Sequence, residues 1–139
     1  MNLKIKKLNS EAKLPTRAHH DDAGIDLYAL GVHTINPGET KIIPTGIAIE
    51  IPYGHVGLIW DKSSIGSKGI KVMGGVIDAG YRGEVAVVMH NLTTSSYTFE
   101  ANHKVAQMLI QKVEMLDIEE VEMLDDTNRG ASGFGSTGK

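Results

Sequence analysis

The sequence contains no cysteine, which excludes both a disulfide framework and a metal site built from thiolates. It also lacks any run of about 18–20 apolar residues, the length that a membrane-spanning helix needs. No apolar stretch of the kind found in signal peptides follows the first residues, 1–7. These absences together favour a cytoplasmic protein, and we expect no membrane partner.

An excess of positive charge is missing as well. The formal net charge is −3, which argues against a protein that binds nucleic acid by neutralising phosphates. The chain has 139 residues, of which 41% are hydrophobic and 22% charged, so one soluble domain with a real core is expected. We therefore expect no nucleic-acid partner.

Short apolar or alternating runs recur about every ten residues between turn signals, a spacing typical of an all-β sandwich or barrel. The sixteen glycines and four prolines supply residues for many turns. The expected strands are residues 3–8, 23–29, 32–35, 42–43, 46–51, 56–60, 84–92 and 97–99. Residues 105–116 fit a helical stripe too, but the turn before them and the strands around them favour a strand.

One glycine-framed stretch, residues 75–84, places an acid and an aromatic ring between two expected strands. Its glycines allow a sharp turn and a close approach to a ligand. Asp78 and Tyr81 are its candidate functional residues. Taken alone, the stretch also fits a hairpin whose acids are solvated turn residues.

Three other segments carry weaker signals. Asp26 lies in an expected strand and is either a solvated residue or a functional acid. The loop at residues 61–69 has hydroxyls, glycines and lysines that suit an anion, although a surface loop has the same composition. The tail at residues 127–139 is either a disordered terminus or a lid that orders over a ligand.

Five segments occur in an order that resembles the motifs of the homotrimeric dUTP pyrophosphatases (dUTPases): DAGIDLYA, KSSIGSKG, GGVIDAGYRGE, KVAQMLI and RGASGFGSTG. The resemblance spans residues 22–138. It implies an all-β fold, a jelly-roll-like β-sandwich or barrel of the dUTPase β-clip type. It also implies a domain of residues 1–125 and a flexible arm of residues 126–139. In a homotrimer with shared active sites, that arm would be exchanged to close a neighbouring site.

The activity implied by the resemblance is hydrolysis of dUTP to dUMP and pyrophosphate. Asp78 matches the general base that activates water for attack on the α-phosphate. Tyr81 matches the ring that packs on deoxyribose and excludes a 2′-hydroxyl. The main chain of Gly75, Val76 and Ile77 matches the segment that binds the uracil edge.

The same resemblance implies how the phosphates are held. Lys62, Ser63 and Ser64 match the phosphate-binding motif, and Gln107 matches a glutamine near the attacking water. Asp26 matches the acid that holds the Mg²⁺ cofactor through water.

In the tail, the resemblance implies contacts to both ends of the nucleotide. Phe134 matches the ring that stacks on uracil. Arg129, Ser136 and Thr137 match groups that bind the β- and γ-phosphates, and Gly135 belongs to the same closing run.

The chain departs from the family pattern at several positions. Lys62 stands where Arg is usual, which loses a bidentate fork. Gly80 replaces a frequent acid, and residues 102–104 replace the usual Gly-Asp/Glu-Arg turn, with Asn102 able to adopt the left-handed conformation. The segment at residues 68–75 is short. Arg82 and Glu84 receive no ligand role and are expected to be structural or at a subunit interface.

Two other functions compete with dUTP hydrolysis. A dCTP deaminase has a similar fold and an Arg-Ser-Ser loop, but the pair Asp78 and Tyr81 and the Phe134 tail favour hydrolysis. A non-catalytic regulator that binds a protein partner would not need Asp78, Asp26 and the tail.

Overall fold

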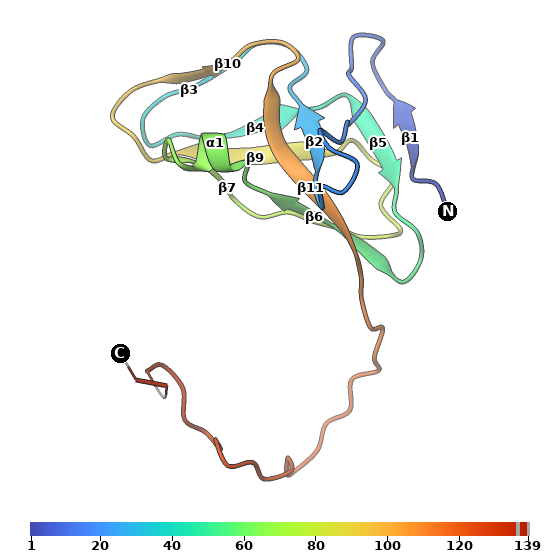
Figure 1. The fold of residues 1–139 in the computed structure, drawn as a ribbon, viewed down its shortest axis with the longest axis vertical. Coiled ribbons are helices and arrows are strands. Elements are labelled where there is room, and N and C mark those ends of the chain that lie inside the picture. Colours follow the sequence, from blue (N-terminus) through green and yellow to red (C-terminus); the bar gives the residue numbers. More distant parts are fainter. Residues whose placement is uncertain (136, 139) are drawn as a thin grey trace.

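The computed structural model describes residues 1–135, 137 and 138, and it is built almost entirely of β-strands (Figure 1). The strands and the single-turn helix are, in chain order, β1 (Lys4–Lys7), β2 (Ile25–Tyr28), β3 (His33–Ile35), β4 (Thr40–Pro44), β5 (Ile47–Glu50), β6 (His55–Trp60), α1 (Ser63–Gly66), β7 (Ile70–Val72), β8 (Val76–Ile77), β9 (Ala86–Asn91), β10 (Tyr97–Phe99) and β11 (Lys104–Lys112). The all-β prediction is confirmed. The described residues contain no helix long and apolar enough to cross a membrane.

Within the described residues, the strands pair antiparallel in four small sheets. A four-stranded sheet has the order β2-β11-β6-β8, and a three-stranded sheet has the order β4-β9-β7. Two pairs, β1-β5 and β10-β3, complete the set. The arrangement is β-sandwich-like, as expected, and the described strands do not close into a barrel.

The core lies between the two larger sheets and follows the alternation of side chains along each strand. In β9, Val87 and Met89 are fully buried, while their neighbours along the strand are half-buried. From the other sheet, Leu27 and Met108 are also fully buried in the same apolar cluster. This packing stabilises the two sheets against unfolding. Truncating a buried side chain of this kind typically lowers the free energy of unfolding by about 2–5 kcal/mol.

The segment at residues 105–116 fits both a helical and a strand pattern. In the structure it forms strand β11 as far as Lys112. The turn before it confirms one expectation, because Asn102 has a φ of 63°, in the left-handed region. Two elements were not expected: residues 70–72 form strand β7, and the loop after β6 forms the turn of helix α1, whose Ile65 is buried in the core. That burial explains why an outwardly polar loop takes a fixed shape.

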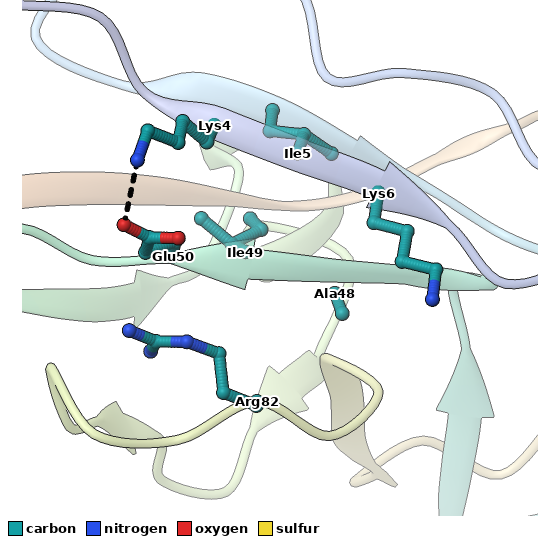
Figure 2. A pocket seen from close by; sticks show the side chains of 7 residues that line it. All are labelled: Lys4, Ile5, Lys6, Ala48, Ile49, Glu50 and Arg82. Atoms are coloured by element: carbon teal, nitrogen blue, oxygen red, sulfur yellow. Dashed lines mark hydrogen bonds and ion pairs between the residues drawn. The ribbon is translucent and has the colours of Figure 1, made fainter.

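The edge strand predicted at residues 3–8 is β1, which pairs with β5. Lys4 Nζ lies 3.0 Å from Glu50 Oε1 across this pair. Beside it is a cavity of about 350 Å³ onto which Lys6 and Arg82 also project (Figure 2). Arg82 is therefore directed at the β1-β5 pair.

After Lys112 the chain leaves the body and runs as an extended arm (Figure 1). Seven large apolar side chains at residues 113–124 are exposed: Val113, Met115, Leu116, Ile118, Val121, Met123 and Leu124. Seven acidic residues and no basic ones are interspersed with them between positions 113 and 126. We call residues 113–126 the acidic-apolar segment.

Candidate active site

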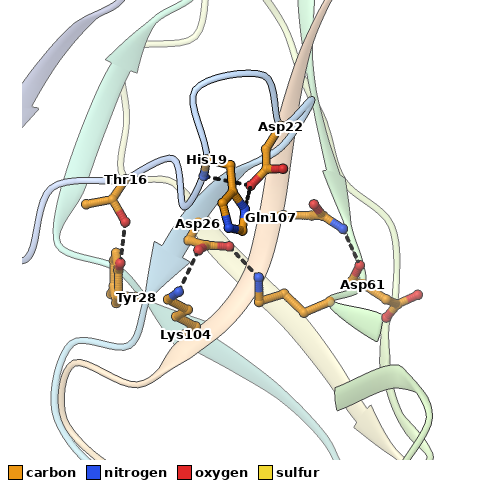
Figure 3. A network of polar contacts seen from close by, with 9 residues as sticks. Thr16, His19, Asp22, Asp26, Tyr28, Asp61, Lys104 and Gln107 are labelled. Carbon is orange, nitrogen blue, oxygen red and sulfur yellow. Dashed lines mark hydrogen bonds and ion pairs between the residues drawn. The ribbon is translucent and has the colours of Figure 1, made fainter. Parts of the chain in front are cut away.

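Asp26 is the centre of a polar cluster on the four-stranded sheet (Figure 3). It is only 4% exposed, so the solvated-residue interpretation is wrong. Lys62 donates a hydrogen bond to its Oδ1 at 2.5 Å, and Lys104 Nζ lies 2.9 Å from Oδ2. Burial raises the pKa of the Asp26 carboxyl, but the hydrogen bonds and charges of the two lysines outweigh it and hold that pKa below its ordinary value. The carboxylate is thus charged and doubly paired.

Gln107 brings a third expected motif into this cluster. Strand β11 lies between β2 and β6, so Gln107 is opposite Asp26 on one side and Trp60 on the other. Its Nε2 donates to the main-chain oxygen of Asp61 at 2.9 Å. Its Oε1 lies so close to Gly24 that a Cβ there would come within 2.1 Å, so any side chain at position 24 would displace the Gln107 amide. The first, second and fourth motifs therefore meet in one place.

The serines expected to bind phosphate lie at the start of α1. Ser63 and Ser64 are both exposed, whereas Ile65 directly after them is buried. Lys62 precedes the helix and turns its side chain toward Asp26. The two hydroxyls thus face solvent, on a helical turn that the buried Ile65 side chain holds to the core.

The glycine-framed hairpin lies around a different cavity. Asp78 and Tyr81 line a cavity of about 260 Å³ together with Val76 and Ile77. The Tyr81 hydroxyl donates to the main-chain oxygen of Glu84 at 2.7 Å. Tyr81 is 43% exposed, so its ring can still contact a ligand.

Two neighbours fix the shape of that hairpin. A Cβ at Gly83 would lie 2.5 Å from the Tyr81 hydroxyl, so glycine is required for the ring to fold back. Glu84 Oε2 accepts a hydrogen bond from the Gly46 N–H at 2.8 Å, which ties the hairpin to the turn after β4. Glu84 was expected to be structural or at a subunit interface, and this hydrogen bond gives its side chain a structural contact.

The main chain of Val76 faces the open edge of the sheet. Strand β8 is the last strand in the order β2-β11-β6-β8, and Ile59 N–H donates to the Gly75 oxygen at 3.0 Å. Since hydrogen-bonded residues alternate along an antiparallel pair, Gly75 and Ile77 point their main-chain groups toward β6. The N–H and C=O of Val76 point away from it. They are the main-chain groups of this segment that can meet a ligand.

The tail residues lie apart from both clusters. Arg129 Nε donates to the Ser132 oxygen at 2.9 Å within the tail itself, and Phe134 is fully exposed. Gly135 and Thr137 are exposed as well, while Ser136 lies outside the described residues. In Figure 1 the tail lies below the sheets, at the end of the extended arm.

The chain therefore brings some expected site residues together and keeps others apart. Asp26, Lys62 and Gln107 share one cluster, whereas none of them lines the cavity at Asp78. Two residues of the cluster were missed from the sequence: Lys104 as a partner of Asp26, and Asp61 as the acceptor for Gln107. The sequence shows that Lys104 replaces the usual arginine. It does not show that Lys104 pairs with Asp26, because the two residues are 78 positions apart and local patterns relate only near neighbours.

The residues near Asp26 suit a magnesium ion only as indirect ligands, which would contact the ion through water molecules. Both carboxylate oxygens of Asp26 face ammonium groups, so neither is open for direct coordination. Across the described ranges, no group of three or more His, Cys, Asp or Glu side chains could hold a metal. The residues fit an ion whose inner ligands are phosphate oxygens and waters.

Comparison with known proteins points in one direction. A model of the dUTPase family matches residues 10–138. A protein of Corynebacterium glutamicum named deoxyuridine 5′-triphosphate nucleotidohydrolase is 47% identical over 141 residues, covering 99% of this chain and 95% of its own length. A protein of the same name from Clostridium tetani is 45% identical over 140 residues, covering 99% and 97%.

Solved structures show the same similarity in three dimensions. The dUTPase of Staphylococcus bacteriophage 80alpha with dUpNHpp has a TM-score of 0.94 at 29% identity, over 99% of both chains. A variant dUTPase of the Staphylococcus aureus phage phi11, described with a structural Mg(II) ion, has a TM-score of 0.84 at 26% identity, over 88% of this chain and 98% of that one.

Proposed function

This chain belongs to the dUTPase family and is an enzyme that hydrolyses dUTP, and we propose that water attacks the α-phosphorus with Asp78 as general base. The observation that carries the proposal is the cavity that Asp78, Tyr81 and Val76 line together. It offers a carboxylate, a ring and an edge of free main-chain groups within one hollow. The products are dUMP and pyrophosphate.

Each wall of that cavity suits one part of a deoxyuridine nucleotide. The N–H and C=O of Val76, at the open edge of β8, match the alternating acceptors and donor of the uracil edge. Gly75 and Ile77 hold this segment to β6. The Tyr81 ring, fixed by its hydroxyl bond to Glu84, packs on the sugar and leaves no room for a 2′-hydroxyl.

Asp78 is suited to the general base role by its position. Its carboxylate is exposed, and within the described residues no side chain or main-chain group donates a hydrogen bond to it. A water placed between Asp78 and the α-phosphorus would give up its proton to this carboxylate as the new P–O bond forms. Exclusion of bulk water by the tail strengthens the base and positions the water.

The Asp26 cluster supplies the phosphate side. Lys62, Ser63 and Ser64 carry one charge and two exposed hydroxyls, which suit β- and γ-phosphate oxygens. Mg²⁺, when bound, neutralises the triphosphate and fixes its oxygens. Asp26 would hold that ion through water, with Gln107 beside the attacking water.

The two sides come from different parts of the surface, and we propose that separate copies in a homotrimer complete each site. The acidic-apolar segment supports this, because it exposes seven large apolar side chains that a neighbouring copy would cover. Residues 126–139 would then form the arm that crosses to a neighbour. Phe134 would stack on uracil there, and Arg129, Gly135, Ser136 and Thr137 would enclose the phosphates.

An assay of product chemistry tests the reaction. Incubation with dUTP, dCTP, dTTP and UTP is followed by measurement of pyrophosphate and ammonia. Pyrophosphate from dUTP alone is the expected result. Ammonia from dCTP without pyrophosphate from dUTP would instead identify the deaminase that shares this fold.

A further inference from the structure

Asp61 makes more contacts than a residue between a strand and a loop usually does. It follows the last residue of β6, and its side chain is only 23% exposed. Val72 N–H donates to its Oδ1 at 2.6 Å, and Lys71 Nζ binds its Oδ2. Its own main-chain oxygen accepts the Gln107 amide. Nothing in the motif pattern assigned a role to this acid.

These contacts close a loop. Residues 61 and 72 are its two ends, and between them lie Lys62, Ser63 and Ser64. The loop also folds back on Asp61, since a Cβ at Gly66 would lie 3.3 Å from the Asp61 Cβ. The Asp61 carboxylate therefore joins the start of the phosphate loop to strand β7.

The charge of Asp61 makes this position informative. A carboxylate beside a triphosphate opposes binding, because like charges repel. Lys71 offsets that charge through its ion pair. A charged acceptor binds a main-chain N–H more strongly than a neutral one does. The acid thus secures the loop, and the lysine removes the repulsion that the acid would cause.

We propose that Asp61 is a positioning residue for triphosphate binding, and that Lys71 is its neutralising partner. The clasp of Asp61 with Val72 N–H and Lys71 fixes the loop that presents Lys62, Ser63 and Ser64. This inference rests on the proposed phosphate role of that loop. It assigns no contact between Asp61 and the substrate.

The test compares a ligand with three phosphates and a ligand with one. Asp61→Ala should weaken binding of dUpNHpp about 10-fold by calorimetry, the change expected for about 1.4 kcal/mol. Binding of dUMP, which lacks the β- and γ-phosphates, should change less than about twofold. Asp61→Asn keeps the acceptor for Val72 N–H and should recover most of the lost affinity. Hydrogen exchange at the Val72 amide should accelerate in Asp61→Ala and much less in Asp61→Asn.

Lys71→Met tests the second half of the proposal. It leaves the Asp61 charge without its ammonium, so dUpNHpp binding should weaken most at low salt. The double variant Asp61→Asn, Lys71→Met removes both charges and should bind better than Lys71→Met alone. If Lys71 bound phosphate directly, the double variant would show no recovery, and the neutralising role would be wrong.

Several outcomes would overturn the inference. Equal loss of dUMP and dUpNHpp binding in Asp61→Ala would show a general structural role, and no loss of either would show no role. If Asp61→Ala does not fold, Asp61→Asn and Lys71→Met still decide the question through the same two ligands. Failure of the proposed function is distinguishable, because the unaltered enzyme would then neither bind dUpNHpp nor release pyrophosphate from dUTP.

Discussion

The two sides of the candidate active site are held in different ways. On the phosphate side, Asp26 is buried between two lysines, and Gln107 is locked against Gly24 and Asp61. On the nucleoside side, the hairpin carries an exposed Asp78 and a half-exposed Tyr81. On the first side, the Asp26 carboxylate and the Gln107 amide nitrogen are paired by contacts within the chain. On the second side, no group in the described part of the chain donates a hydrogen bond to the Asp78 carboxylate, while the Tyr81 hydroxyl is bonded to Glu84 and its ring stays accessible to a ligand.

Replacing the unpaired acid should have the largest effect. Asp78→Asn is expected to lower kcat by about 10²–10⁴-fold, the range for loss of a general base. Because Asp78 is exposed, the free energy of unfolding should change by less than about 0.5 kcal/mol. Pyrophosphate release and denaturant unfolding measure the two effects. Unchanged kcat would remove Asp78 from its role.

A mixing experiment separates one-chain sites from shared sites. A chain truncated after Asp125 should lose activity and keep its fold, since residues 126–139 lie outside the sheets. Dissociating this chain with Asp78→Asn chains and reassembling them should restore part of the activity. An intact arm then closes over an intact Asp78 from another copy. No recovery from assembled mixtures would place both elements on the same chain.

Two glycines allow each side to be disturbed separately, with effects of intermediate size. Gly24→Ala displaces Gln107 and should lower kcat/KM for dUTP by about 10–100-fold, without changing the ratio between dUTP and UTP. Gly83→Ala displaces the Tyr81 ring and should mainly reduce that ratio, by about tenfold. Gly80→Ala is the matched control, because a Cβ there meets no atom within 4 Å. Identical kinetic profiles for the first two variants would contradict the division into sides.

The smallest effect concerns stability and pH. Asp26→Asn should lower the free energy of unfolding at pH 7 by about 1.5–3 kcal/mol, the contribution of hydrogen bonds to a charged group. The pKa of Asp26 in the folded chain is below its unfolded value of about 3.9, so this contribution is present above that value and is lost as pH falls through the folded pKa. Denaturation at pH 7, 5 and 3 should show the difference between the two chains shrinking only at the lowest pH. A constant difference would show that the carboxylate charge is not what stabilises the cluster.

Local patterns predicted most of the architecture. Alternation along residues 84–92 and turn signals such as those after Ile35 predicted β9 and β3, because strand periodicity is a property of neighbouring residues. The left-handed conformation of Asn102 was predictable as well, because asparagine is one of the residue types that adopt it in turns. The segment at residues 105–116 fitted two patterns, and its position between β2 and β6 makes it a strand.

The sequence was sufficient to predict which residues belong to the candidate site. It was not sufficient to predict how those residues are arranged in space. Its motif order indicated Asp26, Gln107 and Asp78, whereas the lysine pair around Asp26 joins positions 36 and 78 residues away. Burial of Asp26 was missed because alternation assumes one wet face of the sheet, and here Lys62 and Lys104 cover that face. The separation of Asp78 from this cluster depends on how whole sheets pack, which no local pattern encodes.

The acidic-apolar segment has a consequence for the newly made chain. Exposed apolar side chains in an extended backbone are the usual starting point for aggregation into cross-β fibrils. Here seven carboxylates are interspersed with the seven apolar side chains. Adding a second such segment beside the first would place like charges together, so the carboxylates act as gatekeepers against self-stacking. The segment can thus remain exposed without stacking on a second copy of itself.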